Sequence, residues 1–275
     1  MQSDSFVTPD GETIHTIYYA PLEDHNRVII LVHGLSEHSG RYEHVAERLA
    51  QAGYHVYSQD NRGHGRSSGE RQYVDSHTRF VTDLKQHYDR IRRKHRTASI
   101  YMLGHSLGSI ISLQFILTYP DAIEAIIVTG TATDVGPTVS RPMRFMGNLV
   151  ERLGKGLPIS SPGGSELLTR DPEMQQWTDD DELMYRGWTK TGIARFALDT
   201  GEKIQDRAHE ITLPILIMHG TDDDITPISG SHIMFERVRS EDKTLKLWDD
   251  MRHEVLNEIE REAVLDFVVD WLDRH

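Results

Sequence analysis

A serine between two glycines is the feature of this sequence with the clearest chemical meaning. Residues 104–108 read Gly-His-Ser-Leu-Gly, with Ser106 at the centre, after an apolar run and before a helical apolar run. In a Gly-x-Ser-x-Gly turn between a strand and a helix, the serine hydroxyl projects above the sheet. Glycines flank the serine because side chains there would collide in so tight a turn. The segment therefore predicts a serine nucleophile and, with it, a hydrolase.

Partners for this serine are expected in two loops further along the chain. A serine hydroxyl needs a histidine base, and the histidine needs a carboxylate that holds its tautomer. In open α/β sheets such groups lie just past the carboxyl ends of strands. The strand-like run 214–220 is followed by three aspartates at 222–224, and the run 243–249 is followed by His253. Serine, acid and histidine thus follow one another along the chain in an order that is found in known catalytic triads.

The elements that must position these residues alternate between strand and helix. The residues predict strands at 13–20, 27–34, 55–60, 99–104, 122–130, 214–220 and 243–249. They predict helices at 41–52, 76–96, 106–119, 229–239 and 257–273, the last one starting with a capping box in which Asn257 is the cap. Such alternation predicts a mostly parallel sheet covered on both faces. The pattern breaks between 131 and 207, which we interpret as an insertion that returns to the same sheet.

The composition excludes several classes of protein. The chain has 275 residues with a formal net charge of −13, and so large a negative charge argues against nucleic-acid binding. No apolar run is long enough for a transmembrane helix, and the polar first residues do not resemble a secretory signal. Cysteine is absent, which removes thiol chemistry and fits a cytoplasmic location. No metal-binding motif is found among the histidines, so we expect neither metal nor cofactor.

Four motifs along the chain resemble those of the α/β-hydrolase superfamily, and within it those of the monoacylglycerol lipases and lysophospholipases. They are HGLSEHSGRY at 33–42, DNRGHGRS at 60–67, HGTDDDITP at 219–227 and RHEVLNE at 252–258. The resemblance implies an α/β-hydrolase fold, with a mostly parallel eight-stranded sheet, helices on both faces and a helical cap. It divides the chain into a core of residues 1–131 and 208–275 and a cap insertion of residues 132–207.

The resemblance also implies how the site works. Ser106 attacks an ester carbonyl, His253 acts as general base and then as general acid, and Asp223 orients His253. A tetrahedral intermediate needs donors that face its oxyanion. The residue after the nucleophile, Leu107, supplies one backbone N–H, and the family resemblance assigns the other to Leu35.

Three assignments depend on small details of the motifs. The family loop places the acid three residues after the glycine of HG, which selects Asp223 and leaves Asp222 and Asp224 as solvated loop charges. The resemblance places Glu37 near the alcohol end of a substrate, although a structural role in its loop is an equal alternative. Trp177 falls where monoacylglycerol lipases tend to carry a tyrosine that lines the pocket, so it is a further candidate for substrate binding.

The cap contains a basic, methionine-rich stretch at residues 141–158 with apolar positions near helical spacing. We interpret it as a lid helix whose apolar face covers the pocket. A transient contact of the cap with a lipid surface is the alternative, and both hold if the lid moves. Peripheral association with membranes would then accompany the cytoplasmic location. The sequence gives no indication of the oligomeric state.

These features predict a serine hydrolase that cleaves single-chain acyl esters, with monoacylglycerols as the first candidates. A lysophospholipase and a short-chain or aryl carboxylesterase are the nearest alternatives. An aminopeptidase on the same fold would hold a substrate amine with acids of the cap, for which Glu166, Glu173 and residues 179–181 are candidates. A non-catalytic ligand-binding protein is the alternative outside enzymes.

Overall fold

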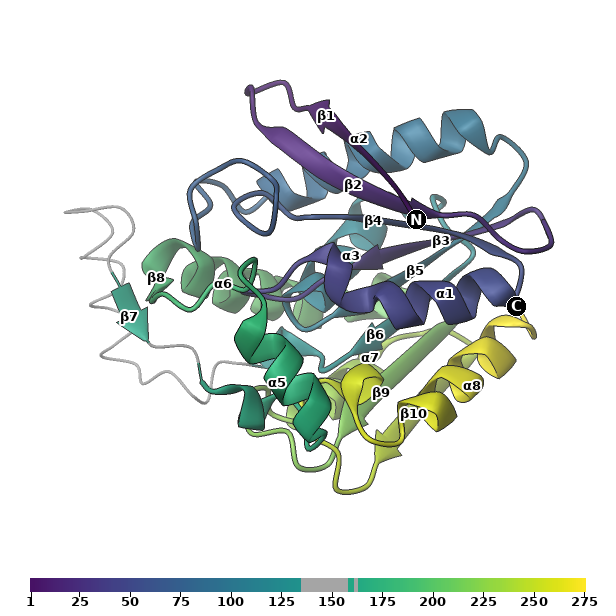
Figure 1. The fold of residues 1–275 in the computed structure, drawn as a ribbon. Coiled ribbons are helices and arrows are strands. Elements are labelled where there is room, and N and C mark those ends of the chain that lie inside the picture. Colours follow the sequence, from purple (N-terminus) through teal and green to yellow (C-terminus); the bar gives the residue numbers. More distant parts are fainter. Residues whose placement is uncertain (135–157, 161–162) are drawn as a thin grey trace.

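The computed structural model describes residues 1–134, 158–160 and 163–275, and it contains one central eight-stranded sheet (Figure 1). The strands are β1 (Gln2–Val7), β2 (Thr13–Tyr19), β3 (Arg27–Val32), β4 (Tyr54–Gln59), β5 (Ser99–His105), β6 (Ala125–Thr129), β9 (Ile215–Gly220) and β10 (Lys243–Trp248), in the order β1-β2-β4-β3-β5-β6-β9-β10. The pairs β1–β2 and β2–β4 are antiparallel and the other five are parallel. The predicted mostly parallel, eight-stranded sheet is confirmed.

Helices cover both faces of this sheet. The described helices are α1 (Glu43–Gln51), α2 (Arg79–Lys94), α3 (Leu107–Thr118), α5 (Pro172–Asp180), α6 (Thr191–Arg207), α7 (Ser229–Arg237) and α8 (Arg261–Leu272). Because side chains alternate along a strand, β3 sends Val28 and Ile30 to one core and Ile29 and Leu31 to the other. The first core packs against α2, α3, α6 and α7, and the second against α1 and α8, which lie in front of the sheet in Figure 1. No described helix is both long and apolar enough to span a bilayer.

Two ends of the core differ from the sequence predictions. Strand β1 was not predicted, because it lies at the sheet edge and only Phe6 of its six side chains is buried, so it has no apolar signal. Helix α8 begins at Arg261 and not at Asn257, so the predicted capping box is wrong. Asn257 belongs to a short 3-10 turn, and its amide donates to Glu254 Oε2 at 2.7 Å. Its side-chain oxygen, which a cap would use as acceptor, has no hydrogen-bond partner among the described residues.

The cap region includes α5, α6 and a short antiparallel pair, β7 (Pro158–Ser160) and β8 (Thr189–Lys190). These two strands were not predicted, since neither is longer than three residues. The predicted lid helix at 141–158 lies outside the described residues, apart from the backbone of Pro158. The cap boundaries at 132 and 207 stay a prediction, although α6 ends at Arg207 and its Phe196 is buried in the first core.

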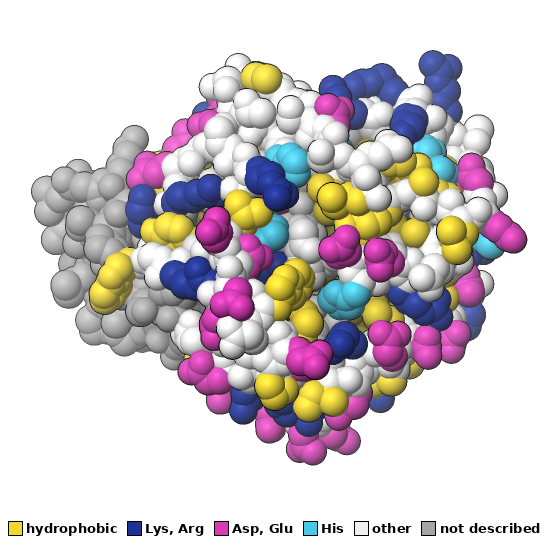
Figure 2. Space-filling view, viewed as in Figure 1, with side chains coloured by type: hydrophobic (Ala, Val, Ile, Leu, Met, Phe, Trp, Pro, Cys, Tyr) yellow, Lys and Arg dark blue, Asp and Glu magenta, His cyan; other side chains and the backbone are white. Residues whose placement is uncertain are grey.

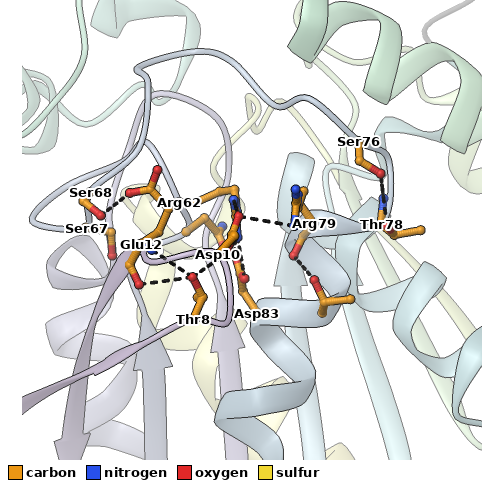
Figure 3. Close-up of polar contacts among 12 residues, drawn as sticks. Thr8, Asp10, Glu12, Arg62, Ser67, Ser68, Ser76, Thr78, Arg79 and Asp83 are labelled. Carbon is orange, nitrogen blue, oxygen red and sulfur yellow. Dashed lines mark hydrogen bonds and ion pairs between the residues drawn. The ribbon is translucent and has the colours of Figure 1, made fainter.

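The loop that follows β4 is anchored by a buried ion pair. Arg62 donates two hydrogen bonds to the Asp83 carboxylate, at 2.6 and 2.7 Å, and both side chains are buried. Figure 3 shows Asp10 between Arg62 and Arg79, at 3.0 and 3.3 Å from their nearest nitrogens. These charges tie the β1–β2 turn, the β4 loop and α2 together.

Replacing Asp83 with asparagine is expected to lower the free energy of unfolding by about 3 kcal/mol, because it leaves the buried Arg62 charge undercompensated. Urea unfolding of purified protein measures the loss. The matched control is Asp89→Asn on the same helix. Asp89 pairs with Lys85 at 2.7 Å but its side chain is 43% exposed, so its loss should cost less than about 1 kcal/mol. Equal effects of the two substitutions would contradict a stabilising role for the Arg62–Asp83 pair.

Candidate active site

Ser106 lies at the turn between β5 and α3, with φ of 51° and ψ of −117°. The turn is tight on both sides of the serine. A Cβ on Gly108 would lie 2.0 Å from the Val32 carbonyl oxygen, and one on Gly104 would lie 2.5 Å from the Gly108 carbonyl oxygen. Only glycine fits at these positions, and the close packing holds Ser106 in its left-handed conformation. Ser106 is 9% exposed and lines a cavity, as the elbow motif predicts.

Asp223 is the aspartate of the three that points into the protein. Its side chain has no exposure, while Asp222 and Asp224 are exposed. Asp223 Oδ2 accepts hydrogen bonds from His253 Nδ1 and from Thr226 Oγ1, both at 2.8 Å. Burial opposes ionisation of this carboxyl group. The positive charge and hydrogen bond of His253 nevertheless hold the pKa of Asp223 well below its usual range.

His219 is a second histidine at Asp223, which sequence reasoning did not assign to the site. It is the second-last residue of β9, is fully buried, and places Nε2 3.0 Å from Asp223 Oδ2. Its Nδ1 lies 2.7 Å from the hydroxyl of Ser231 in α7, which fixes the ring. The signal was present in the sequence, because His219 opens the HG motif that precedes the aspartates.

His253 is buried between Asp223 and the ring of His105. Its Nδ1 must donate to Asp223, since an ionised carboxylate only accepts, so Nε2 is the nitrogen that is left for other partners. Burial lowers the pKa of His253, but the Asp223 charge outweighs burial and raises the pKa from its ordinary value. Gly130, with φ of 53°, leaves room for the ring, because a Cβ there would lie 3.0 Å from His253 Cε1.

Leu35 and Leu107, the residues predicted to stabilise the oxyanion, come from two different segments of the chain. Leu107 is the first residue of α3, so its N–H has no partner within the helix. Leu35 belongs to the loop after β3, and both leucines line the cavity. The next residue, Ser36, has φ of 68°, and its carbonyl oxygen accepts from the Tyr185 N–H at 2.8 Å. This bond joins the loop to the segment between α5 and α6.

Glu37 is buried under the same loop and is connected to the cap through Arg41. Its Oε1 accepts from the Gly34 N–H and from the Tyr42 hydroxyl, and its Oε2 lies 3.3 Å from Arg41 Nε. Burial and the neighbouring Glu254 charge raise the pKa of Glu37.

Arg41, which is fully buried, joins three elements. It donates to Glu254 Oε2 and to the hydroxyl of Thr178 in α5, both at 2.6 Å. In the sequence, Arg41 and Glu254 stand out only as members of the motifs at 33–42 and 252–258. No local pattern places two residues so far apart in the chain in contact.

Trp177, a predicted candidate for substrate binding, does not line the cavity at Ser106. Its side chain is 36% exposed, and its ring lies over the Arg41 guanidinium at 5.3 Å from the centroid. It is not among the described residues that line the cavity, whereas Thr178 is. Adjacent residues of a helix point about 100° apart, so when α5 turns Thr178 inward it turns Trp177 outward.

The cavity has a volume of about 510 Å³ and lies between the strand ends and the cap. Ser106, His253, Leu35, Leu107 and Glu37 line it. The remaining lining is largely apolar and includes Ile110, Leu168, Met184, Ile193, Ala197 and Ile225. No cluster of three or more His, Asp or Glu side chains in the described part of the chain is arranged to hold a metal ion. Such a cavity can enclose an apolar chain next to a hydroxyl and an imidazole.

The fold and the serine at the strand-to-helix turn are those of the α/β-hydrolase class. Comparisons with known proteins identify the family within this class. A family model described as serine aminopeptidase, S33 matches residues 23–260. Monoacylglycerol lipase of Mycolicibacterium smegmatis is 35% identical over 98% of this chain and 96% of its own length. Monoglyceride lipase of Mus musculus is 28% identical over 97% of this chain and 88% of its own length.

Solved structures of monoacylglycerol lipases also superpose on this fold. The crystal structure of Paleococcus ferrophilus monoacylglycerol lipase superposes with a TM-score of 0.84 at 28% identity, covering 94% of this chain and 98% of the other. A soluble variant of monoglyceride lipase from Saccharomyces cerevisiae, in complex with a substrate analog, gives a TM-score of 0.87 at 22% identity, covering 100% and 94%. The chain belongs to the monoacylglycerol lipase-like family of α/β-hydrolases, and it is an ester hydrolase.

Proposed function

We propose that the protein is a monoacylglycerol lipase, which cleaves the ester bond between a single acyl chain and glycerol. The observation that carries the proposal is the cavity that Ser106 and His253 line together beside an apolar lining, with His253 hydrogen-bonded to the buried Asp223. The family relatives named as monoacylglycerol lipases support the same substrate class. No cofactor is required for this reaction.

In the proposed mechanism, Ser106 Oγ attacks the ester carbonyl carbon while His253 Nε2 takes the hydroxyl proton. The carbonyl oxygen becomes an oxyanion, which the N–H groups of Leu35 and Leu107 stabilise. The intermediate collapses when the carbon–oxygen bond to glycerol breaks and His253 returns its proton to the leaving oxygen. Water then attacks the acyl-serine and gives a proton to His253, the bond between the acyl carbon and Ser106 Oγ breaks as His253 returns that proton to Oγ, and the fatty acid is released. Asp223 stabilises the charged form of His253 throughout.

A substrate panel tests the proposal. Initial rates on monoacylglycerols, lysophospholipids, p-nitrophenyl esters of increasing chain length and aminoacyl-p-nitroanilides separate the candidate activities. Monoacylglycerols should give the highest kcat/KM, and a preference for acetyl esters without activity on monoolein would refute the lipase assignment. Preferred cleavage of the anilides would instead support an aminopeptidase, the activity in the family model's description. Of the candidate amine-binding acids, Asp179 lines the cavity, but Asp181 is engaged by His38 at 2.7 Å and Glu166 and Glu173 are exposed.

The activity should depend on pH through His253. Only neutral His253 accepts the serine proton, so kcat/KM should fall as the pH drops through its pKa, which is raised from the ordinary value because Asp223 stabilises the charged ring. Asp223 itself stays ionised over this range and adds no second acidic limb. A kcat/KM profile from about pH 5 to about pH 9 measures the limb. A profile that stays flat down to about pH 5 would contradict the role of His253 as base.

Glu37 is proposed to contact the glycerol end of the substrate. Glu37→Gln keeps an amide oxygen for the Gly34 N–H and the Tyr42 hydroxyl but removes the carboxylate charge. We expect KM for monoacylglycerols to rise about tenfold, the equivalent of one charge-assisted hydrogen bond, with KM for fatty acid methyl esters unchanged. Glu43→Gln, at an exposed position at the start of α1, is the matched control. If KM rises equally for both kinds of ester, Glu37 acts on the loop and not on glycerol.

A further inference from the structure

A second cavity, of about 360 Å³, lies between strands β1 and β2 and the last turns of α2. It shares no lining residue with the cavity at Ser106. Arg90, Arg93 and Lys94 of α2 line it together with His87, and Tyr18 and Tyr57 of the sheet form a wall. Figure 2 shows Lys and Arg side chains gathered over α2 near the top of the molecule.

The charge of this cavity is opposite to that of the protein. Three cationic side chains line it in a chain of net charge −13, and the acid that lines it is Asp4. Asp4 Oδ2 lies 3.4 Å from Arg90, but its side chain is 76% exposed, so the pair is a weak surface ion pair. Arg93 makes no ion pair or hydrogen bond with any other described residue. Cations near a helix C-terminus also complement the helix dipole, which accounts for their sign but not for a cavity.

His87 is the observation that points to a ligand. It is 3% exposed and lines the cavity, yet its Nδ1 has no hydrogen-bond partner among the described residues. The rings of Phe6 and Tyr57 pack at 5.9 and 6.1 Å and offer it no such partner. Burial, aided by the Arg90 charge, lowers the pKa of His87 to about 3, so the ring is neutral and can present one N–H donor. Nδ1 itself is shielded from solvent, so a ligand would meet the ring through the other nitrogen, Nε2, which carries the N–H in that tautomer.

We propose that this cavity is a second ligand site, which binds a small phosphate monoester. The guanidinium groups of Arg90 and Arg93 and the ammonium of Lys94 match the two charges and several acceptor oxygens of the phosphate. The Nε2–H of the His87 ring donates a further hydrogen bond. The Tyr18 and Tyr57 rings, stacked at 4.6 Å between centroids, border the organic part of the ligand. The site is independent of the proposed hydrolase mechanism.

Calorimetric titration of the whole protein with phenyl phosphate, at ionic strength matched with NaCl, tests the site. Arg93→Gln should weaken binding about tenfold. Asp4→Asn should tighten it several-fold, because it removes the competing anion. Arg96→Gln is the matched control, since Arg96 is exposed on the same segment but does not line the cavity. The esterase activity should stay unchanged in all three variants, since none of these residues lies at the Ser106 cavity.

A second measurement does not depend on any variant. In protein labelled with ¹⁵N-histidine, the His87 ring signals should shift when phenyl phosphate saturates the site. An unshifted His87 ring, or equal weakening by Arg93→Gln and Arg96→Gln, would overturn the proposal. Binding to phosphatidic acid vesicles without binding to phenyl phosphate would do so too, because the surface would then recognise a lipid headgroup at a membrane and not a small ligand.

Discussion

Replacing Ser106 with alanine is expected to lower kcat/KM on monoacylglycerols by about 10⁴- to 10⁶-fold. The substitution removes the only oxygen proposed to form the acyl-enzyme, and water is a poorly positioned substitute. Labelling by a fluorophosphonate probe should be lost at the same time. The fold should survive, because alanine at φ of 51° is no more strained than the serine that it replaces.

Ser112→Ala is the matched control for this experiment. Ser112 lies further along α3, is fully buried, and its Oγ has no hydrogen-bond partner among the described residues. Removing this hydroxyl should therefore leave activity, labelling and thermal stability close to those of the unmodified protein. Persistent labelling of the Ser106→Ala variant would show that the nucleophile lies elsewhere. Equal loss of activity in the two variants would point to a general effect on α3.

Replacing Asp223 with asparagine is expected to lower kcat by about 10³- to 10⁴-fold. Asparagine can bind the imidazole in the wrong tautomer and carries no charge to stabilise the imidazolium. The pKa of His253 is raised by the Asp223 charge and lowered by burial, so without that charge it should fall. The acidic limb of the pH profile should therefore move to lower pH in the variant. An unmoved limb would mean that Asp223 does not act through His253.

The neighbouring aspartates provide the controls. Asp222 and Asp224 have the same chemistry, flank Asp223 directly and are exposed. Substitution of either by asparagine should change kcat by less than about twofold, as is usual for exposed positions away from a site. Thermal unfolding of all three variants separates a loss of chemistry from a loss of stability. If Asp222→Asn or Asp224→Asn is the inactive variant, the acid is misassigned.

The central fold was predictable because its signals are local. Buried parallel strands such as β3 and β6 are short continuous apolar runs, and each is followed by a helix pattern or a turn residue. Strand β1 was not predicted because its residues are mostly exposed and give no apolar pattern. It forms a strand because it pairs with β2. The start of α8 was misplaced because Val255–Asn257 form a 3-10 turn before the helix, with the Asn257 amide held by Glu254 and its oxygen capping no described residue.

Motif spacing also identified the region of the site, since turns at the ends of adjacent parallel strands converge. The spacing did not show which aspartate binds His253 or how the loops are connected, because both depend on contacts between residues that are distant in the chain. Asp223, and not its neighbours, reaches the His253 ring from a loop 30 residues away. Arg41 meets Glu254 across 213 residues and Thr178 across 137, which connects the loop after β3 with the end of the sheet and with the cap.

The amino-acid pattern thus determines the alternation of strands and helices, the elbow at Ser106 and the order of the residues proposed for catalysis, because each depends on neighbours in the chain. The orientation of Thr178 toward the pocket and of Trp177 away from it depends on how α5 packs. The unpartnered His87 in a basic cavity depends on how α2 lies against β1 and β2. Burial and electrostatic environment arise only when separate elements pack together, so only the tertiary structure could establish them.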